Sequence, residues 1–202
     1  MELLEKMIVE EGRVYPGDVL KIDSFLNHQI DVKLLFEIGK EFKEIFKDCK
    51  PTKILTVEAS GIAIAFATST FFDYCPVIFA KKDRAMNMFY DTYHADEISY
   101  TRGTRKDVEV SKEYLREEDD ILIIDDFLAN GEALNCLLDI CKQSKCNVLG
   151  CGIVVCKTFQ PGLERIKKQG YRVECLANIK SMDNGKIVFE WKTVGFNLFY
   201  VT

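Results

Sequence analysis

The feature that most constrains the fold is a run of four apolar residues that ends in two aspartates. The run covers residues 121–124, Asp125 and Asp126 follow it, and Gly131 precedes a helix-compatible segment from Glu132 to about Gln143. Four consecutive apolar residues, mostly β-branched, predict a strand that is buried on both faces of a sheet. We therefore predict a short acidic turn that joins a buried strand to a helix.

This turn has the chemistry of a site for a ligand that carries both a phosphate and a diol. Backbone N–H groups at the start of a helix bind anions, and two adjacent carboxylates accept hydrogen bonds from hydroxyl groups. The alternative is that Asp126 is an ordinary turn or cap residue.

Expected strands and helices alternate along the chain. We expect helices at 2–11, 32–46 (capped by Asp31), 61–71 and 132–143, and strands at 53–57, 77–80, 121–124, 148–155, 172–179 and 186–191. This order predicts an α/β fold with an open, mostly parallel sheet flanked by helices. Ligands of such folds bind at the carboxyl ends of strands, where residues 58–61, residues 125–131 and Lys157 fall.

Composition and charge exclude several classes of protein. The 202 residues suit one domain, and the net charge of −5 is spread without a basic stripe, which argues against nucleic acid binding. The longest apolar run, around residues 62–72, is too short to span a membrane, and the first residues do not resemble a signal peptide. We expect a cytoplasmic protein with no membrane contact.

Eight cysteines suggest a metal site or disulfides at first sight. Five of them recur at intervals of five residues from Cys136 to Cys156, and the chain contains no Cys-x-x-Cys pair. On a strand, Cys151 and Cys156 would point to opposite faces. We therefore predict buried, reduced thiols that act as small apolar residues.

Three segments resemble the type I phosphoribosyltransferases, and among them the xanthine phosphoribosyltransferase family. They are LKIDSFLNHQ at 20–29, DDFLANG at 125–131 and KTFQPG at 157–162, and the resemblance runs from the first helix to about residue 190. It implies a type I phosphoribosyltransferase fold in one domain, residues 1–202. A small hood, at about 12–30 and 172–202, would cover a core at about 31–171.

The resemblance also implies an activity. The 5-phosphoribosyl group of phosphoribosyl pyrophosphate (PRPP) would pass to xanthine, giving xanthosine 5′-phosphate (XMP) and pyrophosphate in purine salvage. Magnesium would be bound through PRPP rather than by direct protein ligation, and the protein would be a homodimer. In this family a mobile loop at about residues 81–107 closes over pyrophosphate, and the alternative is a solvated hairpin without a role.

Roles for individual residues follow from the same resemblance. Asp125 and Asp126 would hold the ribose hydroxyls as the catalytic pair. The 5-phosphate would be held by backbone N–H groups of Leu128, Ala129, Asn130, Gly131 and Glu132. Xanthine would be contacted by Leu20, Asn27 and Lys157. Pyrophosphate would be bound by Ala59, Ser60, Gly61, Lys81 and Lys82, together with Arg84.

Each of these assignments has a plainer alternative. Ser60 is also a suitable helix N-cap, and Asn27 a suitable turn residue. The lysines after residue 80 are equally consistent with a solvated surface, and Lys157 with a strand-end lysine that reaches solvent. The Glu132 carboxylate would repel phosphate, so we expect its side chain to turn to solvent.

Three other functions stay open at this stage. A PRPP-sensing transcription regulator would share the site, but no DNA-reading element precedes Lys53. A phosphoribosyltransferase for guanine or hypoxanthine is an alternative, because a few hydrogen bonds separate the purines. A phosphatase-like or receiver-like aspartate site fits weakly.

The apolar tail at 194–202 would dock on the sheet edge or on a second subunit.

Overall fold

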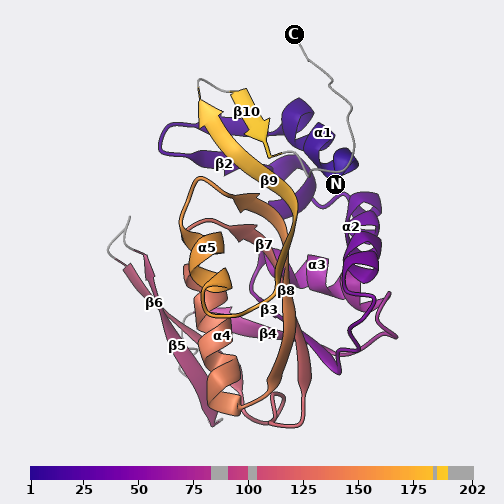
Figure 1. Cartoon of the computed structure of the whole chain (residues 1–202), viewed down its shortest axis with the longest axis vertical. Coiled ribbons are helices and arrows are strands. Elements are labelled where there is room, and N and C mark those ends of the chain that lie inside the picture. Colours follow the sequence, from indigo (N-terminus) through magenta and orange to yellow (C-terminus); the bar gives the residue numbers. More distant parts are fainter. Residues whose placement is uncertain (83–90, 100–103, 184–185, 191–202) are drawn as a thin grey trace.

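A mixed sheet of eight strands forms the centre of the molecule (Figure 1). The computed structural model describes residues 1–82, 91–99, 104–183 and 186–190. The strands of this sheet are β3 (Lys53–Val57), β4 (Val77–Lys82), β5 (Thr92–Ser99), β6 (Thr104–Ser111), β7 (Asp120–Leu128), β8 (Asn147–Lys157), β9 (Val173–Asp183) and β10 (Lys186–Phe189). Their order is β10-β9-β8-β7-β3-β4-β6-β5.

The five middle strands of the sheet, from β9 to β4, run parallel, and antiparallel strands extend both edges. Helices α2 (Val32–Ile45) and α3 (Ser60–Ser69) cover one face, while α4 (Glu132–Ser144) and α5 (Gly162–Lys167) cover the other (Figure 1). The alternation of strands and helices that the sequence predicts is therefore confirmed, as is the α/β class with its mostly parallel sheet.

Strand β7 is buried on both faces, as its apolar run predicts. Ile121 and Ile123 pack in the core cluster beneath α4, whereas Leu122 and Ile124 pack in the cluster beneath α2 and α3. All four side chains are completely buried. Successive side chains on a strand point to opposite faces, so one short segment contributes to both halves of the core.

Helix α2 begins and packs as its sequence indicates. The Asp31 carboxylate accepts a hydrogen bond from the backbone N–H of Leu34 at 2.9 Å, which is the predicted N-cap. Phe42, on the buried face of α2, is completely buried against the sheet. Gly152 of β8 lies beneath it, and a Cβ at that position would be only 2.8 Å from the Phe42 ring.

The pieces expected to form a hood lie at one end of the molecule (Figure 1). They are β1 (Arg13–Tyr15), β2 (Val19–Lys21), a π-helical turn (Asp23–Asn27) and the ends of β9 and β10. Helix α1 (Glu2–Glu11), which was not expected to be part of the hood, lies at the same end. Strands β1 and β2 form a separate two-stranded sheet. The division into a hood and a core stays a prediction.

Two predictions about local structure are wrong. Asp125 and Asp126 belong to β7 rather than to a turn, because β7 stays paired with β8 as far as Leu128. Lys81 and Lys82 are the last residues of β4 instead of following it, because they pair with Glu109 and Val108 of β6.

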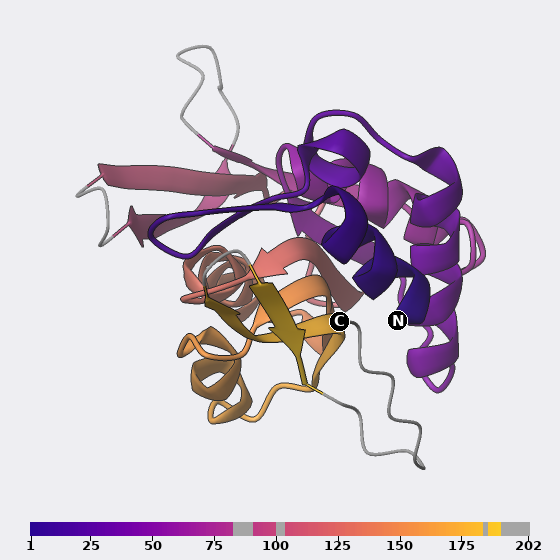
Figure 2. The ribbon, with the colours of Figure 1, turned by 90° about the horizontal axis from the view of Figure 1, so that it is seen from above.

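The described residues of the segment at 81–107 lie mostly in strands and not in a long polar connection, so they have the hairpin form that was given as the alternative. Strands β5 and β6 pair from Thr92 with Ser111 to Ser99 with Thr104, and together they form one edge of the sheet, which projects to one side of the molecule (Figure 2). Arg84, Trp191 and the tail at 194–202 lie outside the described residues.

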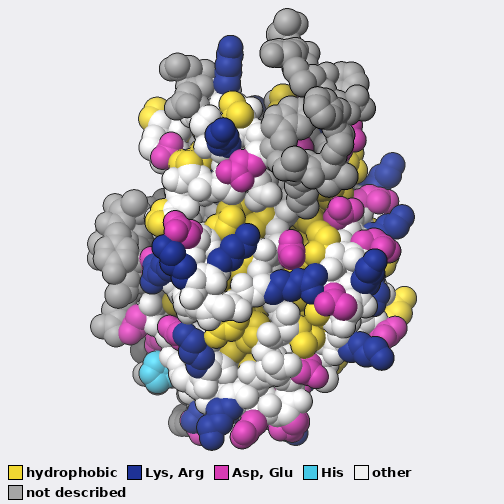
Figure 3. Space-filling model, viewed as in Figure 1, with side chains coloured by type: hydrophobic (Ala, Val, Ile, Leu, Met, Phe, Trp, Pro, Cys, Tyr) yellow, Lys and Arg dark blue, Asp and Glu magenta, His cyan; other side chains and the backbone are white. Residues whose placement is uncertain are grey.

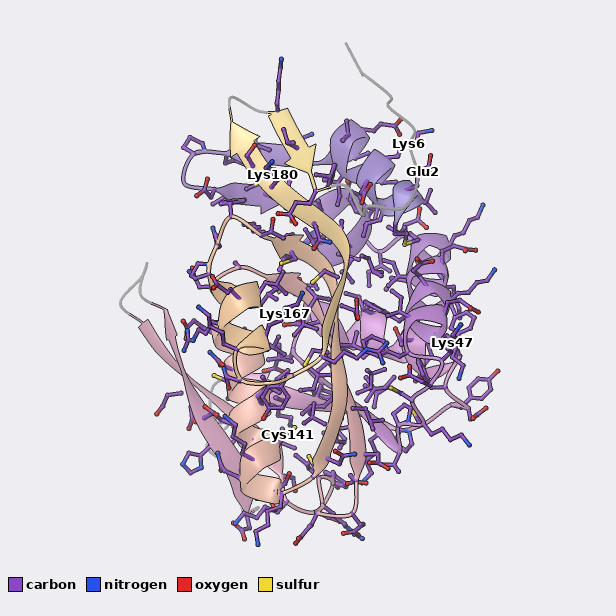
Figure 4. The ribbon with its side chains drawn as sticks, in the orientation of Figure 1. Glu2, Lys6, Lys47, Cys141, Lys167 and Lys180 are labelled. Atoms are coloured by element: carbon purple, nitrogen blue, oxygen red, sulfur yellow. The ribbon has the colours of Figure 1, made fainter. Side chains whose placement is uncertain are left out.

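All eight cysteines lie among the described residues, and each is a thiol rather than half of a disulfide. Six are buried, including Cys141 on α4 (Figure 4), whereas Cys75 and Cys146 are partly exposed. Cys151 and Cys156 do not separate onto opposite faces as predicted, and both belong to the cluster beneath α4. Side-chain alternation is interrupted between them, where the adjacent Val154 and Val155 both join the other cluster.

No helix within the described ranges combines the length and the apolar composition needed to cross a bilayer. On the face shown in Figure 3, basic and acidic side chains are interspersed, with apolar side chains between them.

We expect Gly152→Ala to lower the free energy of unfolding by about 1–3 kcal/mol, because the added methyl group overlaps the Phe42 ring. Urea denaturation measures this loss. The variant Gly152→Ala with Phe42→Leu should lose less than the sum of the two single changes, because the smaller side chain relieves the overlap. Strict additivity, or a Gly152→Ala protein as stable as the parent, would contradict the packing described.

Candidate active site

The acidic pair lies where β7 leaves the core. Asp125 is 2% exposed, and its Oδ1 accepts a hydrogen bond from the backbone N–H of Asp126 at 3.0 Å. Burial, followed by the negative charge of Asp126, raises the pKa of Asp125 well above its ordinary value. The site therefore holds a carboxyl group that is costly to ionise in the absence of a ligand.

Asp126 joins three separate parts of the chain. Its Oδ2 accepts hydrogen bonds from Ser60 Oγ at 2.7 Å and from Asn27 Nδ2 at 3.0 Å. Its Oδ1 accepts one from the backbone N–H of Phe127 at 2.8 Å. Two of the alternative roles are not observed: Asp126 is no turn residue, and Ser60 lies inside α3 without a capping side-chain bond. Asn27 does end a π-helical turn, and its side chain also reaches Asp126.

A loop of three residues, 129–131, connects β7 to α4 and presents the start of that helix. Gly131 has a φ of 86°, a left-handed conformation that favours glycine, and it immediately precedes Glu132. The backbone N–H groups in the first turn of α4 have no partner within the helix, and the helix dipole favours negative charge there. This loop can therefore bind an anion such as a phosphate.

One cavity of about 290 Å³ contains both the acidic pair and this loop. It is lined by Val57, Glu58, Ser60, Lys82, Asp125, Asp126, Phe127, Ala129, Asn130, Gly131, Glu132, Ala133 and Leu134. Hydrogen-bond acceptors for hydroxyl groups and donors for an anion thus face the same space. A sugar phosphate has both of the groups that this arrangement can bind.

The segment between β3 and α3 forms another wall of the cavity. The Glu58 carboxylate accepts a hydrogen bond from the backbone N–H of Lys82 at 2.5 Å, so the segment is tied to the end of β4. Gly61 is packed against Thr56 and Asp125, where a side chain would meet the Thr56 hydroxyl. Within the described residues, that buried hydroxyl has no hydrogen-bond partner.

Lys157 lies at the end of β8, outside the cavity lining. Its ammonium group donates to the backbone carbonyl of Asp18 at 2.7 Å and lies 5.6 Å from the centre of the Phe127 ring. Burial lowers its pKa. Lys157 is thus held between the β1–β2 hairpin and the residue after the acidic pair, and it does not simply reach solvent.

The structure brings most of the predicted residues together. Eight of them line the cavity: Ser60, Lys82, Asp125, Asp126, Ala129, Asn130, Gly131 and Glu132. Asn27 reaches it through Asp126. The remaining predicted residues are absent from its lining: Leu20, Ala59, Gly61, Lys81, Leu128 and Lys157.

Two of these residues are buried for structural reasons. Leu128 is 1% exposed within the cluster beneath α4, and Leu20 is 7% exposed within the cluster beneath α2. Any ligand contact of either residue must therefore come from its backbone or from a small exposed edge of its side chain.

Five cavity residues had no assigned role in the sequence analysis, and the partner of another was missed. The five are Val57, Glu58, Phe127, Ala133 and Leu134. Glu58 lies in the predicted ligand segment 58–61, whereas Phe127 reads as an ordinary core residue. The Glu132 side chain does not turn to solvent as predicted. Its carboxylate pairs with Arg165 at 2.8 Å, and the side chain is 20% exposed. Arg165 lies in α5, so only tertiary structure reveals the pair.

No protein-family model matches this chain. Solved structures show the fold. An adenine phosphoribosyltransferase from Giardia lamblia, complexed with 9-deazaadenine, superposes with a TM-score of 0.72 at 17% identity, covering 87% of this chain and 97% of that one. The adenine phosphoribosyltransferase of Rhodothermus marinus DSM 4252 has a TM-score of 0.70 at 18% identity, covering 89% and 100%.

Curated relatives are much closer in sequence. The xanthine phosphoribosyltransferase of Clostridium novyi (strain NT) is 53% identical over 190 residues, which cover 94% of this chain and 100% of the relative. The xanthine phosphoribosyltransferase of Clostridioides difficile (strain 630) is 49% identical over 189 residues, again covering 94% and 100%. With this identity over nearly its whole length, and with the type I phosphoribosyltransferase fold, the chain belongs to the xanthine phosphoribosyltransferase family.

Proposed function

We propose that this chain transfers the 5-phosphoribosyl group of PRPP to xanthine, giving XMP and pyrophosphate in purine salvage. One observation carries the proposal: the acidic pair of β7 and the start of α4 face the same cavity. Family membership agrees with this arrangement. A ribose with a 5-phosphate would extend between the two groups.

Each part of the cavity would take one part of PRPP. Asp125 and Asp126 would accept hydrogen bonds from the ribose hydroxyls, and the loop from Leu128 to Glu132 would donate backbone N–H groups to the 5-phosphate. Pyrophosphate would lie against the segment at 59–61 and the basic end of β4, at Lys81 and Lys82. Ser60 already reaches Asp126, so the pyrophosphate and ribose sites would be adjacent.

The reaction needs alignment more than reactive side chains. Displacement at the anomeric carbon passes through a transition state that resembles an oxocarbenium ion, and the purine nitrogen is itself the nucleophile. The protein would hold the purine and the sugar in line and exclude water. The negative charge of the acidic pair would favour the positive charge that develops on the sugar.

We expect Mg²⁺ to enter with PRPP. This ion commonly binds through substrate phosphates, retained waters and one or two carboxylates, and it would neutralise the leaving pyrophosphate. Within the described residues, no group of three or more His, Cys, Asp or Glu side chains is arranged to hold a metal. The carboxylates of the cavity, at Glu58, Asp125 and Asp126, fit a metal that is held mainly by the substrate.

Xanthine would be bound beside Phe127, between the hairpin and the end of β8. Lys157 would donate to the purine oxygens, Asn27 would offer its amide, and Leu20 would offer an apolar or backbone contact. The Asn27 amide is already placed at the acidic pair, at 3.0 Å from Asp126. The purine would therefore lie next to the ribose to which it becomes attached.

We also propose a homodimer located in the cytoplasm. Val32, Phe36 and Phe66 are exposed on α2 and α3, and large apolar side chains that gather on one surface often mark an interface between subunits.

The direct test is turnover. Purified protein with Mg²⁺ and PRPP should form XMP from xanthine faster than it forms nucleotides from guanine, hypoxanthine or adenine, as measured by chromatography. Faster turnover of guanine or hypoxanthine would overturn the assignment of xanthine. Tight PRPP binding without turnover of any purine would instead identify a PRPP sensor.

Replacement of Asp125 separates stability from activity. The folded protein binds the Asp125 proton more tightly than the unfolded chain does, so stability falls as the pH rises from the unfolded pKa through the raised folded pKa. Asp125→Asn should therefore raise the free energy of unfolding at neutral pH by about 1–2 kcal/mol. It should also lower kcat/KM by about 100-fold, because a charged hydrogen bond to ribose is lost.

Urea denaturation without ligand, repeated at several pH values, measures this effect, and the gain in stability should disappear near about pH 3. Asp126→Asn is the matched control and should not stabilise the protein. Both oxygens of Asp126 accept hydrogen bonds, so an amide nitrogen would face a donor. If the Asp125→Asn protein is less stable than the parent at neutral pH, the burial of the Asp125 carboxyl group does not destabilise the protein as proposed.

Replacement of Lys157 tests the base site. We expect Lys157→Gln to lower kcat/KM for xanthine by about tenfold, because the purine oxygens lose a charged donor. The KM for PRPP should change by less than about twofold. Lys167→Gln is the control, since Lys167 lies on α5 (Figure 4). Steady-state kinetics with each substrate varied in turn measures both effects. A change in KM for PRPP, with no change in kcat/KM for xanthine, would contradict the role of Lys157 in binding the base.

A further inference from the structure

Glu132 stands between two cavities. It lines the cavity of the acidic pair, and it also lines a groove of about 320 Å³ beside α5 that includes Asn135, Asp139, Arg165 and Gln169. Its carboxylate is therefore close to the proposed 5-phosphate site, at the helix start that would bind the phosphate. An acidic side chain at this position is unexpected in a loop that binds an anion.

We propose that Arg165 is a positioning residue, which holds the Glu132 carboxylate in the groove and away from the phosphate loop. This inference rests on the proposed function, because it assumes that the loop binds the 5-phosphate of PRPP. Among the described residues, Arg165 makes no hydrogen bond to the acidic pair or to residues 129–131, and it contacts the Glu132 side chain, so it would act through Glu132.

Arg165 is fixed at two points along α4. Its Nη1 donates to Glu132 Oε1 at 2.8 Å. When the Asn135 amide oxygen faces Arg165, it accepts from Nη2 at 2.9 Å and from Nε at 3.0 Å. Glu132 and Asn135 are three residues apart and therefore lie on the same face of the helix. The planar guanidinium group can engage both at once, which a lysine could not do.

The backbone of α5 is held against the same loop. The N–H of Gly162 donates to the carbonyl of Ala129 at 3.0 Å. A side chain at Gly162 would collide with that carbonyl and would lie 2.8 Å from the backbone nitrogen of Gly131. Because Gly162 is only three residues before Arg165, this contact places the backbone of Arg165 close to the phosphate loop, and the bond to Glu132 then positions its guanidinium group.

Charge determines what happens without Arg165. A free Glu132 carboxylate could rotate towards the loop, where it would compete with phosphate for the N–H groups and repel it. Its side chain is 20% exposed, so solvent screens this repulsion only in part. Pairing with Arg165 removes both effects and leaves the N–H groups available to the ligand.

The pair contributes mainly to binding and not to folding. Arg165 is 48% exposed, and ion pairs with an exposed partner add little to stability. An Arg165 variant should therefore fold normally and show its defect in PRPP affinity.

The test is a double-mutant cycle on PRPP binding. Calorimetry with Mg²⁺ and PRPP, without purine, should show that Arg165→Gln weakens binding about tenfold. In the Glu132→Gln background, the same change should alter the dissociation constant by less than about twofold, because no carboxylate is released. In turnover assays, Arg165→Gln should raise KM for PRPP and leave kcat nearly unchanged.

Lys168→Gln is the matched control, because it breaks the 2.7 Å ion pair between Lys168, which immediately follows α5, and Glu164 of α5 without touching the loop at 129–131. Its PRPP affinity should equal that of the parent. Equal losses from Arg165→Gln in both backgrounds would overturn the positioning role and indicate a structural one. If the double-mutant cycle gives the expected result but the protein forms no XMP, only the proposed transfer to xanthine is refuted. A parent that does not bind PRPP would overturn both proposals.

Discussion

Burial of β7 on both faces is the constraint on which the site depends. Its four apolar residues join the two halves of the core, so the strand cannot move without disturbing both. The next residue, Asp125, is thereby held at the edge of the core with 2% of its surface exposed. A carboxyl group is tolerated there because the strand before it supplies the stability that its burial removes.

Asp126 connects this rigid strand to two other segments through hydrogen bonds to its carboxylate. Its carboxylate receives donors from Ser60 at the start of α3 and from Asn27 in the π-helical turn, which is 99 residues away in the chain. The three segments therefore meet at the group that is proposed to bind ribose. A ribose hydroxyl that reaches Asp126 must share or replace these donors, so substrate binding and the position of the turn are linked.

Local patterns in the sequence could predict much of the fold, but contacts between distant segments could not be predicted. The strand at 53–57 and the Asp31 cap follow from neighbouring residues. By contrast, β7 continues through two aspartates because Phe127 pairs with Val155 of β8. The ribbon of β5 and β6 has no sustained apolar pattern, so its pairing is a tertiary property. The resemblance pointed to Asn27 and Glu132 but not to their partners.

The segment from Lys157 to Gly162 connects the two ends of the proposed substrate site. Lys157 ends β8 next to the hairpin, and the N–H of Gln160 donates to its carbonyl at 2.9 Å, which turns the chain at once. The N–H of Gly162 then donates to the carbonyl of Ala129 in the loop that is proposed to bind the phosphate. The residue proposed to bind the base and the backbone that supports the phosphate loop are thus five positions apart. Their separation along the chain is therefore set by one short turn.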